Sequence, residues 1–331
     1  MKGTNSMYDI IIIGSGPAGL SAAIYAKRAN LNVAVAEKEY EGTGQIAESG
    51  NVNNYLGIPN INGYDLGEKF REHAVSLDVE FIEKEAVQIE AVQNGEKEES
   101  AIYRVKFDDD TIVEARALIY TAGAYPRKAG VPGEAEYTGK GVSYCAICDG
   151  AFYKGKTVAV LGGGDTALDD ALYLSDICEK VYLVHRRDSF RGAQSTVELL
   201  KQKENVELVL NETMTEIYGE KKPTGIKLKS GRTLAVDGVF VAYGSVPQSE
   251  LIKNLVQLDE RGYVVAGEDG ITYAATKKDD HDRRVQPGLY VAGDVRTKTL
   301  RQVVTAVSDG ANAATTAAEY LRDINGYKQN I

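Results

Sequence analysis

Two glycine-rich turns, each between an apolar strand and a helix, constrain the fold of this chain more than any other feature. The first turn, Gly14-Ser-Gly-Pro-Ala-Gly19, follows the β-branched run Tyr8–Ile13 and leads into a helical segment, Leu20–Ala29. A second strand, Asn32–Ala36, then ends at an acid, Glu37. A strand, a GxGxxG turn, a helix and an acid after the next strand together form a dinucleotide-binding fingerprint. We therefore predict a Rossmann-type βαβ unit near the N-terminus.

Each glycine of this first turn has a distinct expected role. Gly14 permits the tight turn, Gly16 lets a diphosphate approach the backbone, and Gly19 lets the helix pack closely on the strand. The helix N-terminus favours the negative diphosphate, and Glu37 can accept a hydrogen bond from a ribose hydroxyl. A glycine turn without a ligand is the alternative, and the complete context argues against it. The turn residues expected at the dinucleotide are Gly14, Ser15, Gly16, Pro17, Ala18 and Gly19.

The same layout recurs in the middle of the chain with a different ending. A strand, Thr157–Leu161, precedes Gly162-Gly-Gly164 and a helix, Ala167–Leu174. The next strand, Val181–Val184, ends in the basic sequence HRRDSFR (185–191) instead of an acid. Arginines at this offset favour the 2′-phosphate of NADP, which a guanidinium can bind through two parallel hydrogen bonds. The alternative is a solvated charged loop. The residues expected at this second site are Gly162, Gly164, Asp165, Thr166, His185, Arg186, Arg187 and Arg191.

A cysteine pair, Cys145 and Cys148, lies just before the second glycine turn, and the chain has only one further cysteine, Cys178. This spacing fits a reversible disulfide or half of a metal site. A structural zinc needs four ligands, and the chain has neither a second CxxC nor ligand-spaced histidines, so we predict no metal site. Two ordinary core residues are the remaining alternative. The following Asp149 and the nucleotide motifs on either side favour a redox dithiol.

Length and charge limit the class of protein. The 331 residues correspond to about two domains. The 38 basic against 48 acidic residues give a net charge of −10, which argues against nucleic acid or an anionic membrane as a partner. No apolar run approaches the ~20 residues of a membrane span. Few cysteines, two of them in a CxxC, fit a reducing cytosol, so we expect a cytoplasmic protein.

The C-terminal part is expected to return to the first nucleotide site. A short apolar strand, Gly288–Gly293, ends at Asp294, where α/β sheets bind their ligands. An alanine-rich helix then runs to about Arg322, and that helix could equally be only a packed terminal element. Tyr103–Phe107 and Thr111–Ala115 predict a β-hairpin. The charged stretches 94–100 and 277–284 are expected to be exposed, and we assign them no function.

Together these features predict an α/β fold with two Rossmann-like dinucleotide-binding domains, one inserted in the other. Each domain is expected to have three layers in the order ββα. Residues 1–120 and 249–331 would form an FAD-binding domain, and residues 126–248 an NADPH-binding domain that carries the CxxC. The two connections, 121–126 and 242–247, contain Gly and Pro and are expected to act as hinges. A hydride could pass from nicotinamide to flavin and on to the disulfide.

These motifs, in this order, resemble those of the low-molecular-weight thioredoxin reductases, which are flavoproteins with FAD, NADPH and a CxxC disulfide. The resemblance covers nearly the whole chain, and CxxCDG together with HRRxxxR is its most specific part. The motifs that carry it are GSGPAG, TGQI with NNYLG, CAICDG, GGGDTALDD, HRRDSFR and AGDV with RQVVTA. The resemblance implies NADPH-dependent reduction of the disulfide of thioredoxin by a homodimer whose domains swivel against each other.

The resemblance also implies individual roles. Cys148 would face the flavin, Cys145 would be the outward nucleophile, and Asp149 would be the nearby acid/base. The remaining residues that it places at the FAD are Gln45, Asn54, Gly293, Asp294, Arg301, Gln302 and Val303. The alternative acceptors are a glutaredoxin-like protein or a peroxidase partner, since the surface around the cysteines selects the acceptor. A redox-sensing flavoprotein without turnover is a further alternative.

Overall fold

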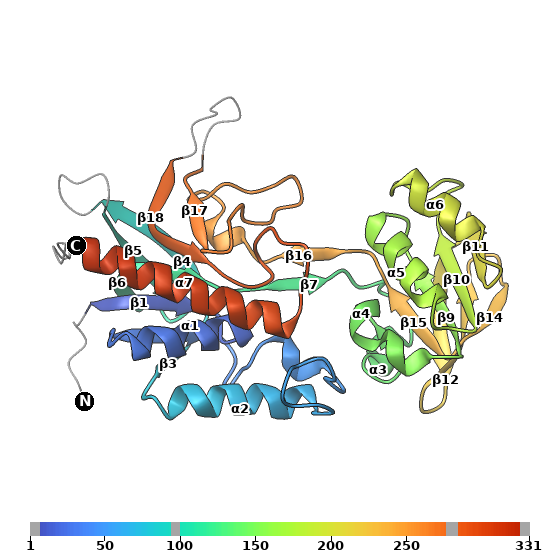
Figure 1. Cartoon of the computed structure of the whole chain (residues 1–331), viewed down its shortest axis with the longest axis horizontal. Helices are drawn as coiled ribbons and strands as arrows, with labels where there is room; N and C mark the ends of the chain where they lie inside the picture. Colours follow the sequence, from blue (N-terminus) through green and yellow to red (C-terminus); the bar gives the residue numbers. More distant parts are fainter. Residues whose placement is uncertain (1–6, 94–99, 276–283, 325–331) are drawn as a thin grey trace. The chain divides into compact units, whose positions relative to one another are not determined.

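The computed structural model describes residues 7–93, 100–275 and 284–324. Contacts divide the chain into two compact units, and Figure 1 labels most of their helices and strands. The first unit consists of the chain up to Asn51, Tyr55–Tyr125 and the chain from Val246 onward. The second consists of Val52–Asn54 and Pro126–Ser245. Except for Ser100 and Arg284, the two charged stretches expected at 94–100 and 277–284 lie outside the described residues.

The first unit is built on a mixed sheet of eight strands with the order β17-β18-β6-β1-β2-β3. The central neighbours are parallel, and β17 closes one edge as an antiparallel strand. β4 and β5 continue from β6 as an antiparallel meander, so the predicted hairpin is confirmed. The strand bounds are β1 Tyr8–Ile13, β2 Val33–Glu37, β3 Glu80–Glu83, β4 Ala86–Gln93, β5 Ala101–Phe107, β6 Ile112–Tyr120, β17 Ile271–Tyr273 and β18 Val285–Val291.

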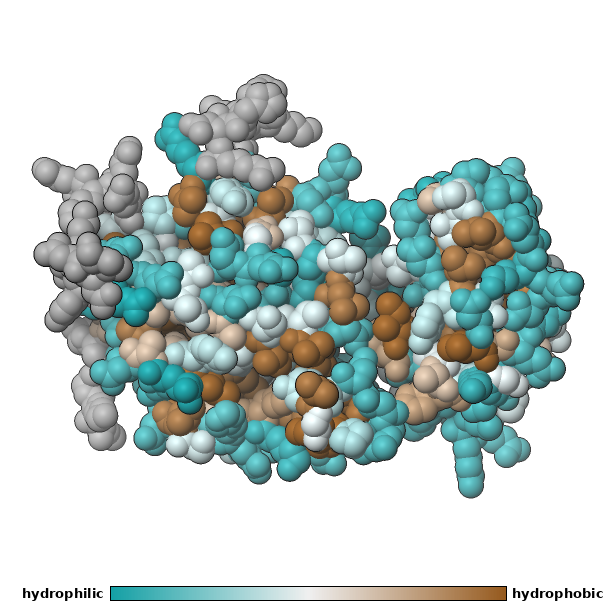
Figure 2. Space-filling view, viewed as in Figure 1, coloured by the Kyte–Doolittle hydropathy of each residue, from teal (hydrophilic) through white to brown (hydrophobic). Residues whose placement is uncertain are grey.

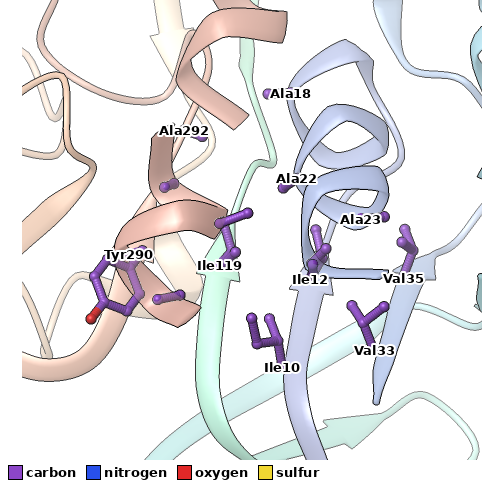
Figure 3. Packing of buried hydrophobic residues seen from close by; sticks show 14 of the residues in the cluster. Ile10, Ile12, Ala18, Ala22, Ala23, Val33, Val35, Ile119, Tyr290 and Ala292 are labelled. Carbon is purple, nitrogen blue, oxygen red and sulfur yellow. The ribbon is translucent and has the colours of Figure 1, made fainter. Parts of the chain in front are cut away.

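Strand β1 is buried on both faces, which explains its unbroken isoleucine run. Ile10 and Ile12 pack in a core under helices α1 (Pro17–Arg28) and α7 (Val303–Ile324), part of which Figure 3 shows. Ile11 and Ile13 point into a second core formed with the meander. Alternate side chains of a strand face opposite ways, so one apolar run serves both layers. A third long helix, α2, spans Gly63–Val75, and the 3₁₀ turns lie at Gln45–Glu48 and Glu250–Ile252.

The second unit repeats this plan. Its parallel sheet has the order β11-β10-β9-β15-β8, and a three-stranded antiparallel sheet, β12-β13-β14, accompanies it. The strand bounds are β8 Val142–Ser143, β9 Thr157–Leu161, β10 Lys180–His185, β11 Val206–Leu210, β12 Met214–Gly219, β13 Pro223–Leu228, β14 Thr233–Ala235 and β15 Gly238–Val241. Its helices are α3 Glu134–Tyr137, α4 Ala146–Asp149, the 3₁₀ turn Gly150–Tyr153, α5 Asp165–Ser175 and α6 Gln194–Lys201.

Strand β9 has the same two-faced burial as β1. Val158 and Val160 pack in the core that holds α5, whereas Ala159 and Leu161 pack with residues of β12–β14. In the first unit, helices cover one face of the parallel strands and the β4–β5 meander, which continues the same sheet, covers the other; in the second unit the antiparallel sheet is separate. The predicted α/β fold with two Rossmann-like, three-layered units is confirmed.

The chain passes from one unit to the other through two short strands, β7 (Ala124–Pro126) and β16 (Ser245–Pro247), which pair with each other. The Arg127 N–H donates to the Gly244 carbonyl at 2.9 Å on one side of this pair. The Gln248 N–H donates to the Gly123 carbonyl at 2.9 Å on the other. Both ends of the inserted segment are thus adjacent in space.

Hydrophilic residues cover much of the face seen in Figure 2, as expected when the apolar side chains are gathered in the four cores. Within the described ranges, no helix has the length and apolar character needed to cross a membrane. The same ranges contain no cluster of three or more His, Cys, Asp or Glu side chains placed to hold a metal ion.

Candidate functional site

The first glycine turn joins β1 to α1 with no room for side chains behind it. Gly14 has φ +105°, and its N–H donates to the Ala36 carbonyl at 2.9 Å. A Cβ on Gly19 would lie 1.9 Å from the Gly14 carbonyl oxygen, so only glycine fits there. By contrast, a Cβ on Gly16, the residue that caps α1, would meet nothing within 4 Å. Open space therefore lies at the helix N-terminus, where backbone N–H groups can hold a diphosphate.

Glu37 stands at the end of β2 and is anchored by the glycine turn itself. The Ser15 backbone N–H and hydroxyl donate to Oε2 of Glu37 at 3.1 and 2.8 Å. The Lys38 N–H donates to Oε1 at 2.8 Å. The Glu39 N–H also donates to Oε1, at 3.3 Å, so hydrogen bonds from the protein fix the carboxylate where the fingerprint places the acid for a ribose hydroxyl. Ser15 is fully buried and orients this acid, a role that the sequence did not indicate.

Two further residues expected at the first nucleotide are Gln45, which begins the 3₁₀ turn Gln45–Glu48, and Asn54, which lies in a loop. Gln45 donates from Nε2 to the Ala124 carbonyl at 2.9 Å, which places its side chain beside the exit from β6. Asn54 lies in the Val52–Asn54 segment that groups with the second unit, and its role stays a prediction. Pro17 begins α1, where its missing N–H costs nothing. Ala18 is buried against α7. The two helices approach closely at this point, since a Cβ on Gly310 of α7 would lie 2.0 Å from the Ala18 carbonyl oxygen.

The turn after β18 carries Asp294. Gly293 has φ +80°, and one oxygen of Asp294, Oδ1, is buried without a hydrogen-bond partner. Burial raises the pKa of Asp294. Arg301 donates to the Asp294 carbonyl at 3.4 Å and lies over the Tyr263 ring, 4.1 Å from its centroid. Two expected residues follow: the Gln302 N–H donates to the Thr305 hydroxyl at 3.2 Å, and Val303 opens α7.

Three charged residues that sequence reasoning missed lie behind this turn. Asp309 of α7 accepts two hydrogen bonds from Arg296, at 3.0 and 2.7 Å, and one from Lys298 at 2.9 Å. It also accepts a hydrogen bond from the Gly293 N–H at 3.1 Å. Burial opposes ionisation, but the hydrogen bonds from Arg296 and Lys298 outweigh it and lower the pKa of Asp309. No local sequence pattern indicates this network, because Arg296 and Lys298 lie in a loop and Asp309 lies in an alanine-rich helix whose sequence predicts only packing.

The second glycine turn, between β9 and α5, has the same construction. A Cβ on Gly162 would lie 2.6 Å from the Ala242 carbonyl, whereas a Cβ on Gly164 would meet nothing within 4 Å. Asp165 accepts a hydrogen bond from the Ala193 N–H at 2.8 Å, and the Arg191 N–H donates to the Gly163 carbonyl at 2.8 Å. The loop that follows β10 therefore folds back onto the turn. Thr166, the other expected residue here, is exposed in the first turn of α5.

His185 lies at the end of β10 with its ring against this turn. A Cβ on Gly163 would lie 2.2 Å from the imidazole, and the ring stacks on Phe190 with centroids 5.3 Å apart. Burial lowers the pKa of His185, and the neighbouring arginines lower it further. Arg186, Arg187 and Arg191 are exposed, and within the described ranges no acid lies at ion-pair distance from them. Three arginines without an acidic partner among the described residues thus lie near the second glycine turn.

The cysteine pair forms a disulfide, with a Cα–Cα distance of 5.3 Å between Cys145 and Cys148, so the expected redox centre is confirmed. The Ser143 hydroxyl accepts a hydrogen bond from the Cys145 N–H at 3.1 Å. Cys148 is exposed and Cys145 is half-buried. Asp149 is partly buried, and burial raises its pKa, although the Ser143 side chain hydrogen-bonds to it and opposes the rise. An acid with a raised pKa thus lies one residue from the disulfide.

A buried acid, Glu134, supports this segment and was not predicted. It is only 3% exposed and accepts hydrogen bonds from the Tyr144 hydroxyl at 2.9 Å and from the N–H groups of Ala129 and Gly130 at 2.7 and 2.6 Å. On the other side of the cysteines, a Cβ on Gly150 would lie 2.9 Å from the Tyr173 ring. The disulfide segment is therefore fixed at both ends.

The residues present fit a dinucleotide at each turn. Gly16 and Gly164 leave open space in front of helices α1 and α5. In the first unit, the Asp294 side chain is 33% exposed, so its carboxylate can accept a hydrogen bond from a ligand hydroxyl. In the second unit, the uncommitted arginines can bind a phosphate.

Comparison with known proteins gives the family. Residues 8–310 match the family described as pyridine nucleotide-disulphide oxidoreductase. The chain is 38% identical to a thioredoxin reductase of Listeria monocytogenes, over 98% of this chain and 97% of that protein. It is 39% identical to a thioredoxin reductase of Bacillus subtilis, over 96% of each. The crystal structure of thioredoxin reductase from Streptococcus pyogenes has a TM-score of 0.87 at 36% identity, with 97% and 100% of the two chains covered.

The chain therefore belongs to the pyridine nucleotide-disulphide oxidoreductases and, within that family, to the thioredoxin reductases. Membership implies a flavin and a pyridine nucleotide as cofactors. The confirmed disulfide agrees with a CxxC redox centre.

Proposed function

We propose that this chain is an NADPH-dependent thioredoxin reductase. It reduces the disulfide of thioredoxin through FAD and the Cys145–Cys148 pair, and it acts as a homodimer. The observation that carries the proposal is the disulfide, which lies in the same unit as a glycine turn flanked by uncommitted arginines. The other unit carries the fingerprint that ends in Glu37, as expected for a second dinucleotide with a free ribose.

In this proposal residues 1–120 and 249–331 bind FAD, and residues 126–248 bind NADPH. The Gly14–Gly19 turn and Glu37 hold the ADP half of FAD, and Asp294 receives a hydroxyl of its flavin half. The residues that complete this site are Gln45, Asn54, Gly293, Arg301, Gln302 and Val303. The Gly162–Gly164 turn with Asp165 and Thr166 holds the NADPH diphosphate, and the cluster of His185, Arg186, Arg187 and Arg191 holds its 2′-phosphate.

The bound flavin would supply a path for two electrons from the nicotinamide to the disulfide. Two electrons and two protons convert the Cys145–Cys148 disulfide to two thiols. The Cys145 thiolate attacks the disulfide of thioredoxin and forms a mixed disulfide, which releases one partner thiolate. The Cys148 thiolate then attacks Cys145, which restores the internal disulfide and releases reduced thioredoxin. Asp149, whose pKa is raised by burial, donates a proton to a departing thiolate.

The roles of the two cysteines are testable because Cys148 is the more exposed of the two in the structure. Cys145→Ser should abolish thioredoxin reduction and leave reduction of the flavin by NADPH intact. Cys148→Ser should trap the mixed disulfide with thioredoxin through Cys145, and a trap formed by the Cys145→Ser variant instead would reverse the assignment. Cys178→Ala is the control, since that thiol is buried and outside the pair.

Two measurements test the function as a whole. Stopped-flow titration with NADPH should show uptake of four electrons per chain, two by the flavin and two by the disulfide, whereas two electrons would exclude the thiols. Steady-state NADPH oxidation should be fastest with thioredoxin. Turnover with a glutaredoxin-like protein or a peroxidase partner, and none with thioredoxin, would contradict the proposed acceptor. Light scattering of the purified protein tests the homodimer.

A further inference from the structure

A buried network of three charges, Arg296, Lys298 and Asp309, lies directly behind the Gly293–Asp294 turn. The side chains of these three residues are 8%, 6% and 7% exposed. Asp309 uses both carboxylate oxygens, Oδ1 for one bond to Arg296 and Oδ2 for a second bond to Arg296 and for the bond to Lys298. Arg296 also donates to the Thr297 carbonyl at 3.0 Å. The network is therefore well satisfied and held in one geometry.

Lys298 is the member of this network that reaches the turn residue. Its ammonium lies 2.9 Å from Asp309 Oδ2 and 3.7 Å from Asp294 Oδ1. That Asp294 oxygen is the buried atom without a hydrogen-bond partner. A lone carboxylate in such a position would tend to take up a proton, because burial disfavours its charged form. A cation at 3.7 Å opposes this and limits the rise in the pKa of Asp294 that burial causes.

Stability alone does not account for such an arrangement. Replacing a buried ion pair by apolar residues of similar volume is often neutral or stabilising. What the network adds is a fixed position for Asp294, whose Oδ1 faces the Lys298 ammonium at 3.7 Å. The other cation near the turn, Arg301, donates to backbone carbonyls of Asp294 and Arg296 rather than to the Asp294 carboxylate.

We propose that Lys298, held in place by Asp309, is a positioning residue for the flavin half of the dinucleotide. It favours the charged form of Asp294 and holds the inner oxygen, Oδ1, so that the exposed part of this carboxylate, whose side chain is 33% exposed, accepts a hydrogen bond from a hydroxyl of the ligand. The inference rests on the proposed binding of FAD by the first unit. It assigns to Lys298 and Asp309 an effect on the flavin half alone, since the ADP half would be held by the Gly14–Gly19 turn and Glu37.

The test compares two ligands on the apoprotein. FAD carries both halves, and ADP carries only the half that Lys298 does not affect. Lys298→Met keeps the aliphatic stem and removes the charge, and Asp309→Asn removes the anchor. The matched control is Lys203→Met, which deletes a Lys–Asp pair of 2.6 Å on the surface of the second unit. Titration calorimetry gives the dissociation constant of each ligand for each variant.

We expect Lys298→Met and Asp309→Asn to weaken FAD binding by about tenfold or more, the loss of one hydrogen bond to a charged group. The affinity for ADP should change by less than about twofold, which is less than the loss of one hydrogen bond would cause. Lys203→Met should leave the affinity for both ligands unchanged. Unchanged FAD affinity in Lys298→Met would overturn the inference. An equal loss of FAD and ADP affinity would also overturn it, because that pattern indicates general damage to the unit.

The outcomes separate this inference from the proposed function. If the wild-type apoprotein does not bind FAD, the flavin assignment itself is wrong and the inference falls with it. If the wild type binds FAD and the variants bind it equally well, only the inference is wrong. Should Asp309→Asn fail to fold, Lys298→Met decides alone, since it leaves the Arg296–Asp309 pair in place.

Discussion

The hydroxyl of Tyr144 donates a 2.9 Å hydrogen bond to the carboxylate of Glu134, and Tyr144 directly precedes Cys145. The same carboxylate accepts the N–H groups of Ala129 and Gly130, which follow the strand that leads into the second unit. One buried acid thus connects the entry of the inserted segment to the residues that hold the disulfide.

Replacing this acid by its amide should destabilise the protein markedly. In Glu134→Gln, the NH₂ group must face at least one backbone N–H or the Tyr144 hydroxyl, so a buried donor loses its acceptor. We expect the free energy of unfolding to fall by about 2–4 kcal/mol, and by about 1 kcal/mol in Tyr144→Phe, which removes a single hydrogen bond. Urea denaturation measures both. A loss below about 0.5 kcal/mol in Glu134→Gln, the range of ordinary surface substitutions, would contradict this reading.

Gly19 and Gly16 of the first turn should respond differently to alanine. Gly19→Ala places a Cβ 1.9 Å from the Gly14 carbonyl, so we expect a loss of about 3 kcal/mol or more in stability and no FAD retention. Gly16→Ala meets open space at a φ of −64°, so the apoprotein should keep its stability while FAD binds more weakly. Thermal unfolding of the apoproteins and FAD titration distinguish the two. Full FAD affinity in Gly16→Ala would show that the open space is not the ligand site.

The arginines after β10 should set the preference for NADPH over NADH. Removing one of Arg186, Arg187 or Arg191 deletes a charge-assisted contact of about 1.5–3 kcal/mol, or about 10–100-fold in kcat/KM for NADPH. Rates with NADH should change little, because NADH lacks the 2′-phosphate. Arg232→Ala is the control, since that guanidinium is ion-paired with Glu207 at 2.6 Å. Equal effects on both nucleotides would show that these arginines do not contact the phosphate.

Asp149 should make both stability and turnover depend on pH. Its pKa is raised from 3.8, so the folded state binds the proton more tightly than the unfolded state. Its contribution to stability is then complete at acidic pH and declines as pH rises through the raised pKa. Asp149→Asn cannot ionise, so its stability relative to wild type should improve from about pH 4 upward, while turnover falls by about 10²–10⁴.

Urea denaturation of the oxidised proteins between about pH 4 and about pH 8 checks the stability part of this prediction. Asp188→Asn, at an exposed acid of the same unit, is the control and should show no such trend. A constant difference between wild type and Asp149→Asn across this range would indicate that burial does not perturb the acid.

Much of the fold could be predicted because its signals are local. The isoleucine run of β1, the glycine turns and the β5–β6 hairpin each lie within a few consecutive residues, and the structure confirms them. The CxxC spacing likewise places two sulfurs on one turn, where a disulfide forms. The predicted bounds were less accurate: α1 begins at Pro17 rather than Leu20, because the first turn of the helix already includes the glycine loop.

The supporting charges could not be predicted, because their partners are distant in sequence or give no pattern. Ser15 anchors Glu37 across 22 residues, and Asp309 sits inside a helix where the surrounding alanines indicate only packing. Glu134 precedes the cysteines by 11 positions, and nothing in its neighbourhood distinguishes it from a surface acid. Each became recognisable only when its burial and its hydrogen bonds were known.

The insertion of one unit into the other also sets the order in which they can be completed during translation. Nearly all of the second unit is one continuous stretch, Pro126–Ser245, so it can fold as soon as that stretch leaves the ribosome. The first unit must wait, because β18 pairs with β6 and α7 packs on α1 only after the C-terminal segment has been made. A nascent chain can therefore complete the unit that holds Cys145 and Cys148 while the sheet of the first unit still has an open edge.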